Sequence, residues 1–238
     1  MLRGEAGLRH AVNAAWPELA LDRLEQAKVA VNVGPRDGGP GGAFPFHFDV
    51  SSSKDARRQL TALLYLNPDW QDGDGGEVEL LPFPFPDLLV APVDRRLVLF
   101  SSNTTMHRVR PFRGAQSRVV INLWFDGSLE VPFPPPLPDD GGYDGRALRI
   151  VRVLRRQPLE LRAFCKVWYR DAIGDSLREA FLPCGALDAA VELHRAEAAE
   201  VERRIAPATL AALRECVPLE CQAERVDVGA LLLDGFDP

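Results

Sequence analysis

Two residues in the segment FPFHFDV, His47 and Asp49, carry side chains that are suited to binding a metal ion. On an extended strand, residues i and i+2 face the same side, so this imidazole and this carboxylate can converge on one ion. A third ligand must come from elsewhere, and His107 in NTTMHRV follows directly after the strand-like run RRLVLFSS. Two histidines and one carboxylate on one face of a metal, with the other positions open, are typical of non-haem Fe(II) sites that use O₂. The sequence therefore predicts a metal site at these three residues.

The other two histidines and one arginine require separate interpretation. His10 and His194 lie in helical, charged contexts, so we expect both to be ordinary surface residues. Arg118 opens the run SRVVINLWF, downstream of His107. If Arg118 is buried, it needs a partner, because an unpaired buried charge is very costly and its planar fork matches a carboxylate. A surface arginine at the start of a strand is the alternative at this point.

Short runs rich in β-branched and aromatic residues predict a β-rich core between residues 28 and 125. Clusters of Gly, Pro, Asp and Asn, such as GPRDGGPGG and NPDWQDGDGG, separate these runs. Strands this short, with turns at this density, favour a β-sandwich or a barrel. The predicted strands are AKVAVNV, QLTALLYLN, GEVELLPF, RRLVLFSS and SRVVINLWF.

The chain changes character on both sides of this core. Up to about residue 25, apolar residues at helical spacing, interrupted by Pro17, predict one or two short helices. After the core, VPFPPPLPDDGGYDG is typical of a stiff linker, with an SH3-type ligand as the less favoured alternative. Beyond Arg146, LELRAFCKVWYRDAI, DSLREAFL, ALDAAVELHRAEAAEVERRI and PATLAALREC predict helices, with Pro207 in a first turn. The amphipathic stretch 186–205 is expected to pack on the β core, with dimerisation as the alternative.

These patterns divide the chain into four parts. Residues 1–25 are expected to form an N-terminal helical segment, and residues 26–130 the β domain. Residues 131–146 are expected to be a Pro- and Gly-rich linker, followed by a helical C-terminal region at 147–238.

Five motifs in a defined order carry a resemblance to a known family. The order HFD, LLYLNPDW, DGGEVEL, RLVLFSSNTTMHRV and SRVVINLWF resembles the prolyl 4-hydroxylase branch of the 2-oxoglutarate- and Fe(II)-dependent oxygenases. The resemblance covers roughly residues 28–125, less than half of the chain. It implies a double-stranded β-helix, a relative of the jelly roll, with the metal between its two sheets. The predicted fold is therefore mainly β with helices: this jelly-roll core plus a C-terminal helical segment.

The resemblance also implies roles for individual residues. His47, Asp49 and His107 match the iron ligands of the family. Arg118 matches the basic residue that pairs with the distal carboxylate of 2-oxoglutarate. Tyr65 matches a tyrosine whose hydroxyl binds the same carboxylate.

Further residues are expected around the cosubstrate. Asn122 lies four residues after Arg118, so on a strand it shares that face and is expected to line the pocket. Asn32 stands where related hydroxylases often carry a tyrosine, and its amide can still donate a hydrogen bond. Gly75 and Gly76 resemble the family's tight turn into the next strand. The Gly-rich loop GPRDGGPGGAFPF is interpreted either as a flap over the iron or as a flexible connector.

The implied activity is hydroxylation of a C–H bond, coupled to decarboxylation of 2-oxoglutarate to succinate. The implied cofactors are Fe(II), 2-oxoglutarate and O₂, with ascorbate as an optional addition. A prolyl or other peptidyl residue is the expected substrate, and a small molecule is the alternative. Hydroxylation is favoured over halogenation because Asp49 keeps the carboxylate that halogenating relatives lose. Two other functions remain open: a non-catalytic jelly-roll binding module, and a different divalent metal in a hydrolase-like or cupin site.

Bulk composition limits the remaining possibilities. With 46% hydrophobic and 26% charged residues, the sequence is typical of an ordinary globular protein. The formal net charge of −6 argues against a sequence-independent nucleic-acid binder. The N-terminal residues contain no signal-like or membrane-spanning apolar run, so we expect a soluble cytoplasmic or other intracellular protein without a membrane partner. The four cysteines form no CxxC pair and are expected to be buried free thiols, and the oligomeric state is not indicated.

Overall fold

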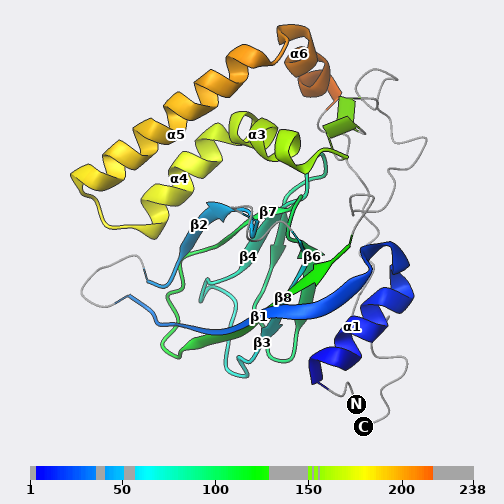
Figure 1. Ribbon diagram of the computed structural model, residues 1–238. Helices are drawn as coiled ribbons and strands as arrows, with labels where there is room; N and C mark the ends of the chain where they lie inside the picture. Colours follow the sequence, from blue (N-terminus) through cyan, green and yellow to red (C-terminus); the bar gives the residue numbers. More distant parts are fainter. Residues whose placement is uncertain are drawn as a thin grey trace.

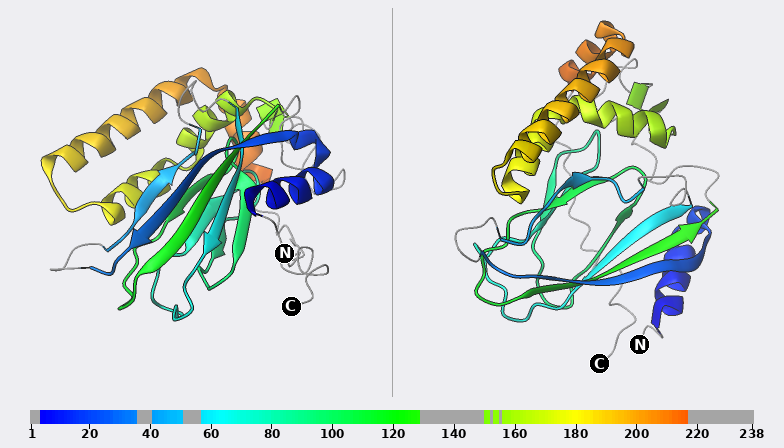
Figure 2. Two further views of the ribbon diagram at one scale, coloured as in Figure 1. Left: turned by 60° about the horizontal axis from the view of Figure 1, so that its bottom comes forward. Right: turned by 60° about the vertical axis from the view of Figure 1, so that its left-hand side comes forward.

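The protein is built from two four-stranded antiparallel sheets with helices on two sides (Figures 1 and 2). This computed structural model describes residues 4–35, 41–50, 57–128, 150–151, 153–154 and 156–216. The expected linker at 131–146 and the centre of the Gly-rich loop, residues 36–40, lie outside the described residues. In chain order the elements are α1 (Gly4–Ala15), the 3-10 helix η1 (Pro17–Leu19), β1 (Leu21–Asn32), β2 (Phe44–His47), β3 (Arg58–Tyr65), β4 (Val78–Leu81), β5 (Leu88–Val90), β6 (Leu97–Ser101), β7 (Met106–Val109), β8 (Arg118–Gly127), α3 (Pro158–Trp168), α4 (Arg170–Ala180), α5 (Gly185–Arg204) and α6 (Pro207–Cys216).

The strand order confirms the expected jelly-roll type of core. The major sheet has the order β1-β8-β3-β6 and the minor sheet the order β2-β7-β4-β5, so neighbouring strands are mostly distant in the sequence. Within the described part of the chain the two sheets do not join into a closed barrel. All five strands predicted from β-branched runs are present, as β1, β3, β4, β6 and β8. The short strand β5 was not predicted, because its three residues lie among prolines.

The first strand begins earlier than the sequence pattern indicates. Leu21 and Leu24 fit helical spacing, but both lie in β1, which pairs with β8 from Leu21 onward. The preceding helical segment stops at Ala20, whose backbone is left-handed with φ 42°. The side chain of Asn13 then bonds both the backbone N–H and the carbonyl of Leu21. Pairing with a distant strand therefore overrides the local helical pattern.

Three hydrophobic clusters hold the layers together. One lies between α1 and the outer face of the major sheet, and includes Leu8, Val12, Leu60 and Phe125. The second fills the space between the sheets and consists of Leu63, Tyr65, Val78, Leu80, Phe100 and Val120. The third joins the minor sheet to the C-terminal helices and includes Phe46, Phe83, Met106, Leu161, Phe164 and Leu213.

The C-terminal helices form a layer over the minor sheet (Figures 1 and 2). The run predicted as one helix from residue 159 to 173 is divided at Tyr169 into α3 and α4. Helix α4 contacts β2, whereas α5 packs on α3 and α4, so the stretch 186–205 packs mainly on helices rather than on the β core. His194 of α5 is buried and its Nε2 is 3.0 Å from the carbonyl of Arg170, so its assignment to the surface was wrong; His10 is exposed as expected.

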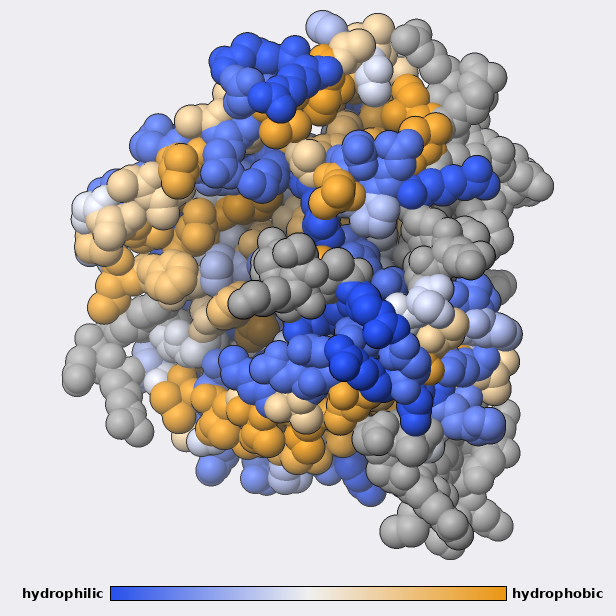
Figure 3. All heavy atoms as spheres, viewed as in Figure 1, coloured by the Kyte–Doolittle hydropathy of each residue, from blue (hydrophilic) through white to orange (hydrophobic). Residues whose placement is uncertain are grey.

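The cysteines and the exposed apolar residues have different settings. Cys165 is buried, and burial raises the pKa of its thiol, whereas Cys184 is exposed, contrary to expectation. Apolar side chains are visible at the turn between α4 and α5 and along β1 (Figure 3); the exposed ones there are Phe181, Leu182, Val29, Val31 and Val33. Across the described residues, no helix is both long and apolar enough to span a bilayer.

Candidate active site

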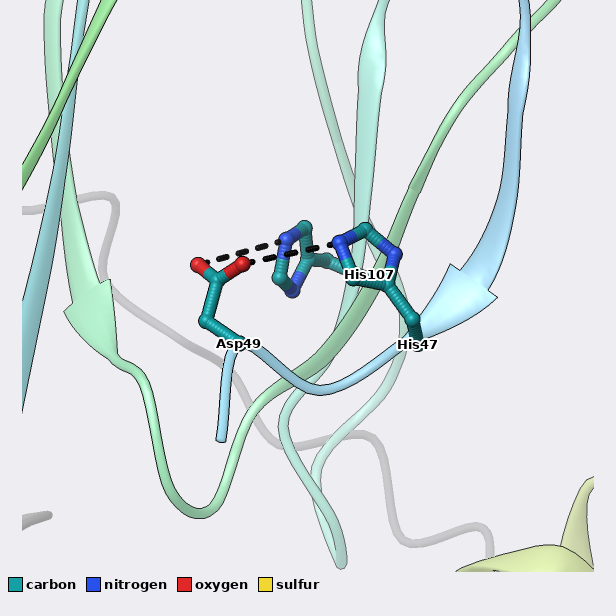
Figure 4. Close-up of side chains that lie close together, drawn as sticks. All are labelled: His47, Asp49 and His107. Carbon is teal, nitrogen blue, oxygen red and sulfur yellow. Dashed lines mark ion pairs between the residues drawn. The ribbon is translucent and has the colours of Figure 1, made fainter. Parts of the chain in front are cut away.

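The three predicted metal ligands meet between the two sheets (Figure 4). His47 is the last residue of β2 and pairs directly with His107 of β7 in the minor sheet. Asp49 lies in a bend after β2 rather than on the strand itself, which corrects the expectation that a continuous strand would align the pair. The bend turns the carboxylate toward both imidazoles.

The distances between the three side chains fit a single metal ion. Asp49 Oδ1 is 3.5 Å from His47 Nε2, and Asp49 Oδ2 is 3.6 Å from His107 Nε2. One ligand atom from each residue lies within 4.8 Å of the others. Ligand atoms about 2.0–2.2 Å from a shared ion are themselves roughly 3–3.5 Å apart, so small side-chain movements would complete the coordination. The donor set of two imidazoles and one carboxylate suits Fe(II) and leaves one face of the ion open.

Hydrogen bonds to the backbone orient both imidazoles. The Nδ1 of His47 lies 3.0 Å from the carbonyl of Pro45, and the Nδ1 of His107 lies 3.2 Å from the carbonyl of Thr105. A carbonyl only accepts, so Nδ1 must be the protonated nitrogen in each neutral ring. The lone pair of each Nε2 is thereby left for the metal.

The ionisation of the ligands also favours metal binding. Burial opposes the charged form of Asp49, but hydrogen bonds with His47 and Thr61 and the interaction with His107 outweigh it and hold the pKa of this carboxyl far below its usual range. Burial, together with the nearby His47 and against the effect of Asp49, lowers the pKa of His107 to about 4. At neutral pH the site therefore offers an anionic carboxylate and a neutral His107.

Thr61 is a site residue that the sequence interpretation missed. Its hydroxyl lies 2.6 Å from Asp49 Oδ2 and 2.7 Å from Ser102 Oγ, so it fixes the carboxylate from the major sheet. Thr61 and Tyr65 are four residues apart on β3, and this spacing, which puts both on one face, could have identified Thr61.

We expect Thr61→Val to weaken metal binding without unfolding the protein. Valine keeps the shape but leaves Asp49 without its hydroxyl donor, and loss of such a supporting bond costs about 10-fold in metal affinity. Isothermal titration with Mn(II) measures the change. Thr61→Ser keeps the hydroxyl and serves as the control, and equal affinities for the two variants would contradict this role of Thr61.

Arg118 is buried between the sheets, where its hydrogen-bond partners among the described residues are neutral. Its side chain is 1% exposed, and none of the carboxylates in the described ranges forms an ion pair with it. Three of its five N–H groups have neutral acceptors: the carbonyl of Gly76 at 2.6 Å, Oδ1 of Asn32 at 2.9 Å and the hydroxyl of Tyr65 at 3.5 Å. Burial lowers the pKa of Arg118, although a guanidinium stays protonated at neutral pH. The remaining N–H groups, and a charge that Glu77 compensates only at a distance and without an ion pair, make this a candidate site for a carboxylate.

The other predicted cosubstrate residues differ in how closely they approach Arg118. Tyr65 is completely buried, and burial raises the pKa of its hydroxyl despite the nearby Arg118, so it is a neutral hydrogen-bonding group. Asn32 lies beside Arg118 and accepts from it, rather than acting only as a donor. Asn122 donates to the backbone carbonyl of Lys28 at 3.2 Å, so its place in the pocket stays a prediction.

The two glycines before β4 allow Arg118 to take its position. Gly75 and Gly76 both have positive φ, of 74° and 76°. A Cβ on Gly76 would lie 2.6 Å from Cδ of Arg118, so only glycine fits against this side chain.

We therefore expect Gly76→Ala to weaken binding of 2-oxoglutarate by about 10-fold or more, because the added methyl group displaces Arg118. Gly73→Ala is a matched control: its φ of 94° imposes similar backbone strain, but nothing lies within 4 Å of the added Cβ. Both variants should lose stability, and only Gly76→Ala should lose affinity in a cosubstrate titration at saturating Mn(II). Equal losses of affinity would attribute the effect to strain alone.

The side chain of Phe100 lies between the metal ligand His107 and Tyr65, the neighbour of Arg118. Its ring is 4.6 Å from that of His107, and it packs in the same buried cluster as Tyr65. The candidate metal site and the candidate carboxylate site are therefore linked through one buried aromatic side chain.

One basic and one aromatic side chain, Arg58 and Trp124, also lie next to Asp49. The guanidinium of Arg58 donates to the backbone carbonyl of Asp49 at 2.8 Å and lies 4.9 Å from the ring centre of Trp124. The indole N–H of Trp124 is near enough to Asp49 to contribute to its lowered pKa, but it makes no hydrogen bond of ordinary geometry with any residue the structure describes. No motif in the sequence indicated either residue.

Comparison with known proteins agrees with this geometry. Residues 30–126 match the profile of the 2OG-Fe(II) oxygenase superfamily, and this span includes the three candidate ligands and Arg118. No curated relative matches the chain.

Three solved structures of prolyl hydroxylases are similar to this chain. A prolyl 4-hydroxylase from Phytophthora capsici is 29% identical with a TM-score of 0.66, over 89% of this chain and 69% of its own. A prolyl 4-hydroxylase from Pseudomonas putida is 29% identical with a TM-score of 0.45, over 53% and 65%. A prolyl hydroxylase from Trichoplax adhaerens, in complex with a peptide fragment of the hypoxia inducible factor oxygen degradation domain, is 24% identical with a TM-score of 0.41, over 51% and 56%.

Proposed function

We propose that this chain, a 2-oxoglutarate-dependent dioxygenase of the 2OG-Fe(II) oxygenase superfamily and its prolyl 4-hydroxylase-like branch, hydroxylates a C–H bond of a prolyl or other peptidyl residue. The observation that carries the proposal is the buried Arg118, a cation with neutral partners next to a His-Asp-His cluster. A metal site alone is compatible with many activities. An adjacent pocket for a carboxylate favours a 2-oxo acid cosubstrate.

Each residue of the site has a distinct role in this proposal. His47, Asp49 and His107 would hold Fe(II), and a set of three protein ligands of this type would leave positions for the cosubstrate and O₂. Arg118 and Tyr65 bind the distal carboxylate of 2-oxoglutarate, and Asn32 orients Arg118 through their hydrogen bond. When bound, Fe(II), 2-oxoglutarate and O₂ supply the oxidation, in which one oxygen atom enters succinate, the other enters the substrate C–H bond, and CO₂ is released.

The carboxylate of Asp49 supports hydroxylation rather than halogenation, and the indole N–H of Trp124 supports a substrate that carries a hydrogen-bond acceptor. Asp49 occupies a position that a halogenating enzyme would need for chloride. The indole N–H of Trp124 interacts weakly with Asp49 and forms no hydrogen bond of ordinary geometry with a described residue, so a carbonyl of a bound peptide is a suitable acceptor for it.

The decisive experiment is an anaerobic titration with Fe(II) and 2-oxoglutarate. A weak visible charge-transfer band is expected when both bind, followed by succinate when O₂ is admitted. The band without succinate, under all substrates tried, would favour the non-catalytic binding module. Neither band nor succinate would contradict the proposed function.

Substrate identity and ascorbate dependence are open to a second experiment. We expect prolyl peptides to stimulate succinate formation more than small metabolites do. Preference for a metabolite would redirect the proposal to a small-molecule substrate. Omission of ascorbate from the same assay tests whether it is required.

A further inference from the structure

The strand that carries His47 is weakly fixed within its own sheet. β2 has only four residues and lies at the edge of the minor sheet, next to β7 alone. Its register with β7 is defined by two residue pairs, Phe44 with Val109 and His47 with His107, with an irregularity between them. A short edge strand of this kind needs other contacts to hold a metal ligand in a fixed position.

Helix α4 supplies a contact on the free side of this strand. The hydroxyl of Ser176 accepts a hydrogen bond from the backbone N–H of Phe46 at 3.1 Å and donates to the carbonyl of Ile173 at 2.8 Å. Ser176 is 1% exposed, so water does not replace it. The bond reaches the residue directly before His47.

A second connection runs from α4 to the residue directly after His107. The guanidinium of Arg108 donates to Glu79 of β4 at 2.7 Å and to Glu179 of α4 at 2.8 Å. Its carbon Cζ lies 4.9 Å from the ring centre of Phe46. Arg108 thus joins β7, β4 and α4 around the side chain that precedes His47.

We propose that α4 is a positioning element of the metal centre, in which Ser176 holds β2 and Glu179 holds β7, so that the C-terminal helical layer sets the separation of His47 and His107. This inference rests on the proposed function. Helix α4 contacts the minor sheet, whereas Arg118 and Tyr65 lie on strands of the major sheet. The C-terminal helices should therefore control metal binding much more than binding of the distal carboxylate of the cosubstrate.

The test uses the full chain and Mn(II) as the probe. Ser176→Ala removes the acceptor of the Phe46 N–H, and we expect metal affinity to fall by about 3- to 10-fold, the lower part of the range for supporting interactions around metal ligands. Hydrogen exchange of a peptide covering residues 44–50 should accelerate. Affinity for 2-oxoglutarate, measured at saturating Mn(II), should stay unchanged.

Two further variants separate positioning from loss of stability. Glu179→Gln weakens the bond to Arg108 at a half-exposed residue, so the protein should fold, and we expect a smaller loss of Mn(II) affinity. Glu197→Gln breaks the ion pair with Lys166 between α3 and α5, away from β2, and should bind Mn(II) as the unmodified chain does.

The results with these variants distinguish positioning by α4 from a general loss of stability and from failure of the metal site itself. Unchanged Mn(II) affinity in a folded Ser176→Ala variant would overturn the inference, as would an equal loss in Glu197→Gln. If Ser176→Ala does not fold, Glu179→Gln decides: reduced affinity supports positioning by α4, and unchanged affinity overturns it. Failure of the unmodified chain to bind Mn(II) would instead contradict the proposed metal site itself.

Discussion

Asp49→Ala is expected to abolish metal binding in practice, with Mn(II) affinity reduced by at least about 100-fold and no succinate formed. Loss of a direct ligand must exceed the loss of roughly 10- to 100-fold that follows removal of a supporting residue. The change removes the only anion of the cluster, so the two imidazoles would have to hold a dication alone. Calorimetry with Mn(II) and the succinate assay measure the effect.

A matched control distinguishes the ligand from a buried carboxylate in general. Asp126 is 2% exposed and pairs with Arg23 at 2.6 Å, on a strand of the same domain. Asp126→Asn should lower stability modestly and leave Mn(II) affinity intact. If Asp49→Ala still binds Mn(II), the ion must bind at another site, and the assignment of His47, Asp49 and His107 as its ligands would be wrong.

Arg118→Met should remove 2-oxoglutarate binding while preserving the metal site. Loss of one partner from a buried ion pair costs about 3–5 kcal/mol, and each 1.4 kcal/mol is tenfold in affinity, so the Kd for 2-oxoglutarate should rise by about 100-fold or more. Mn(II) affinity should change little, because Arg118 contacts none of the three ligands. Calorimetry with Mn(II) first and 2-oxoglutarate second separates the two events.

The same variant should have opposite effects on stability with and without cosubstrate. Without an anion, Arg118 is a buried cation with neutral partners, so methionine should leave Tm unchanged or raise it. With 2-oxoglutarate present, ligand binding stabilises the original chain but not the variant. Arg118→Lys, which keeps the charge but not the fork, should be intermediate.

Arg95→Met provides the control for loss of an arginine. The side chain of Arg95 is 90% exposed and, within the described part of the chain, forms an ion pair with the adjacent Asp94 alone, so neither metal nor cosubstrate binding should change. Unaltered 2-oxoglutarate binding in Arg118→Met would argue for a different divalent metal site of the hydrolase or cupin type.

The sequence by itself predicted the types of metal ligand and five strands of the β core. The HxD motif and a later histidine after a strong strand predicted the metal half of the site, and the role of Arg118 was implied by the family resemblance that the order of the motifs carries. The preference of imidazole and carboxylate for metals is a local property of the residues, and the three predicted ligands lie together, although Asp49 reaches the two imidazoles from a bend rather than from a continuous strand. The beginning of β1 was misjudged for the complementary reason: pairing with β8 outweighs the local spacing of Leu21 and Leu24.

Only the tertiary structure decided which residues support the site. Thr61, Trp124 and Arg58 reach Asp49 from other strands, and Ser176 reaches β2 across more than a hundred residues of sequence. The structure also placed Asp49 in a bend and buried Arg118 without an ion pair to any described carboxylate. Burial and hydrogen bonding between distant segments depend on how the sheets and helices pack, and no local pattern encodes them. The metal ligands could therefore be proposed from residue type and the order of the motifs, whereas the surroundings of Arg118 and the contacts of α4 with β2 could not.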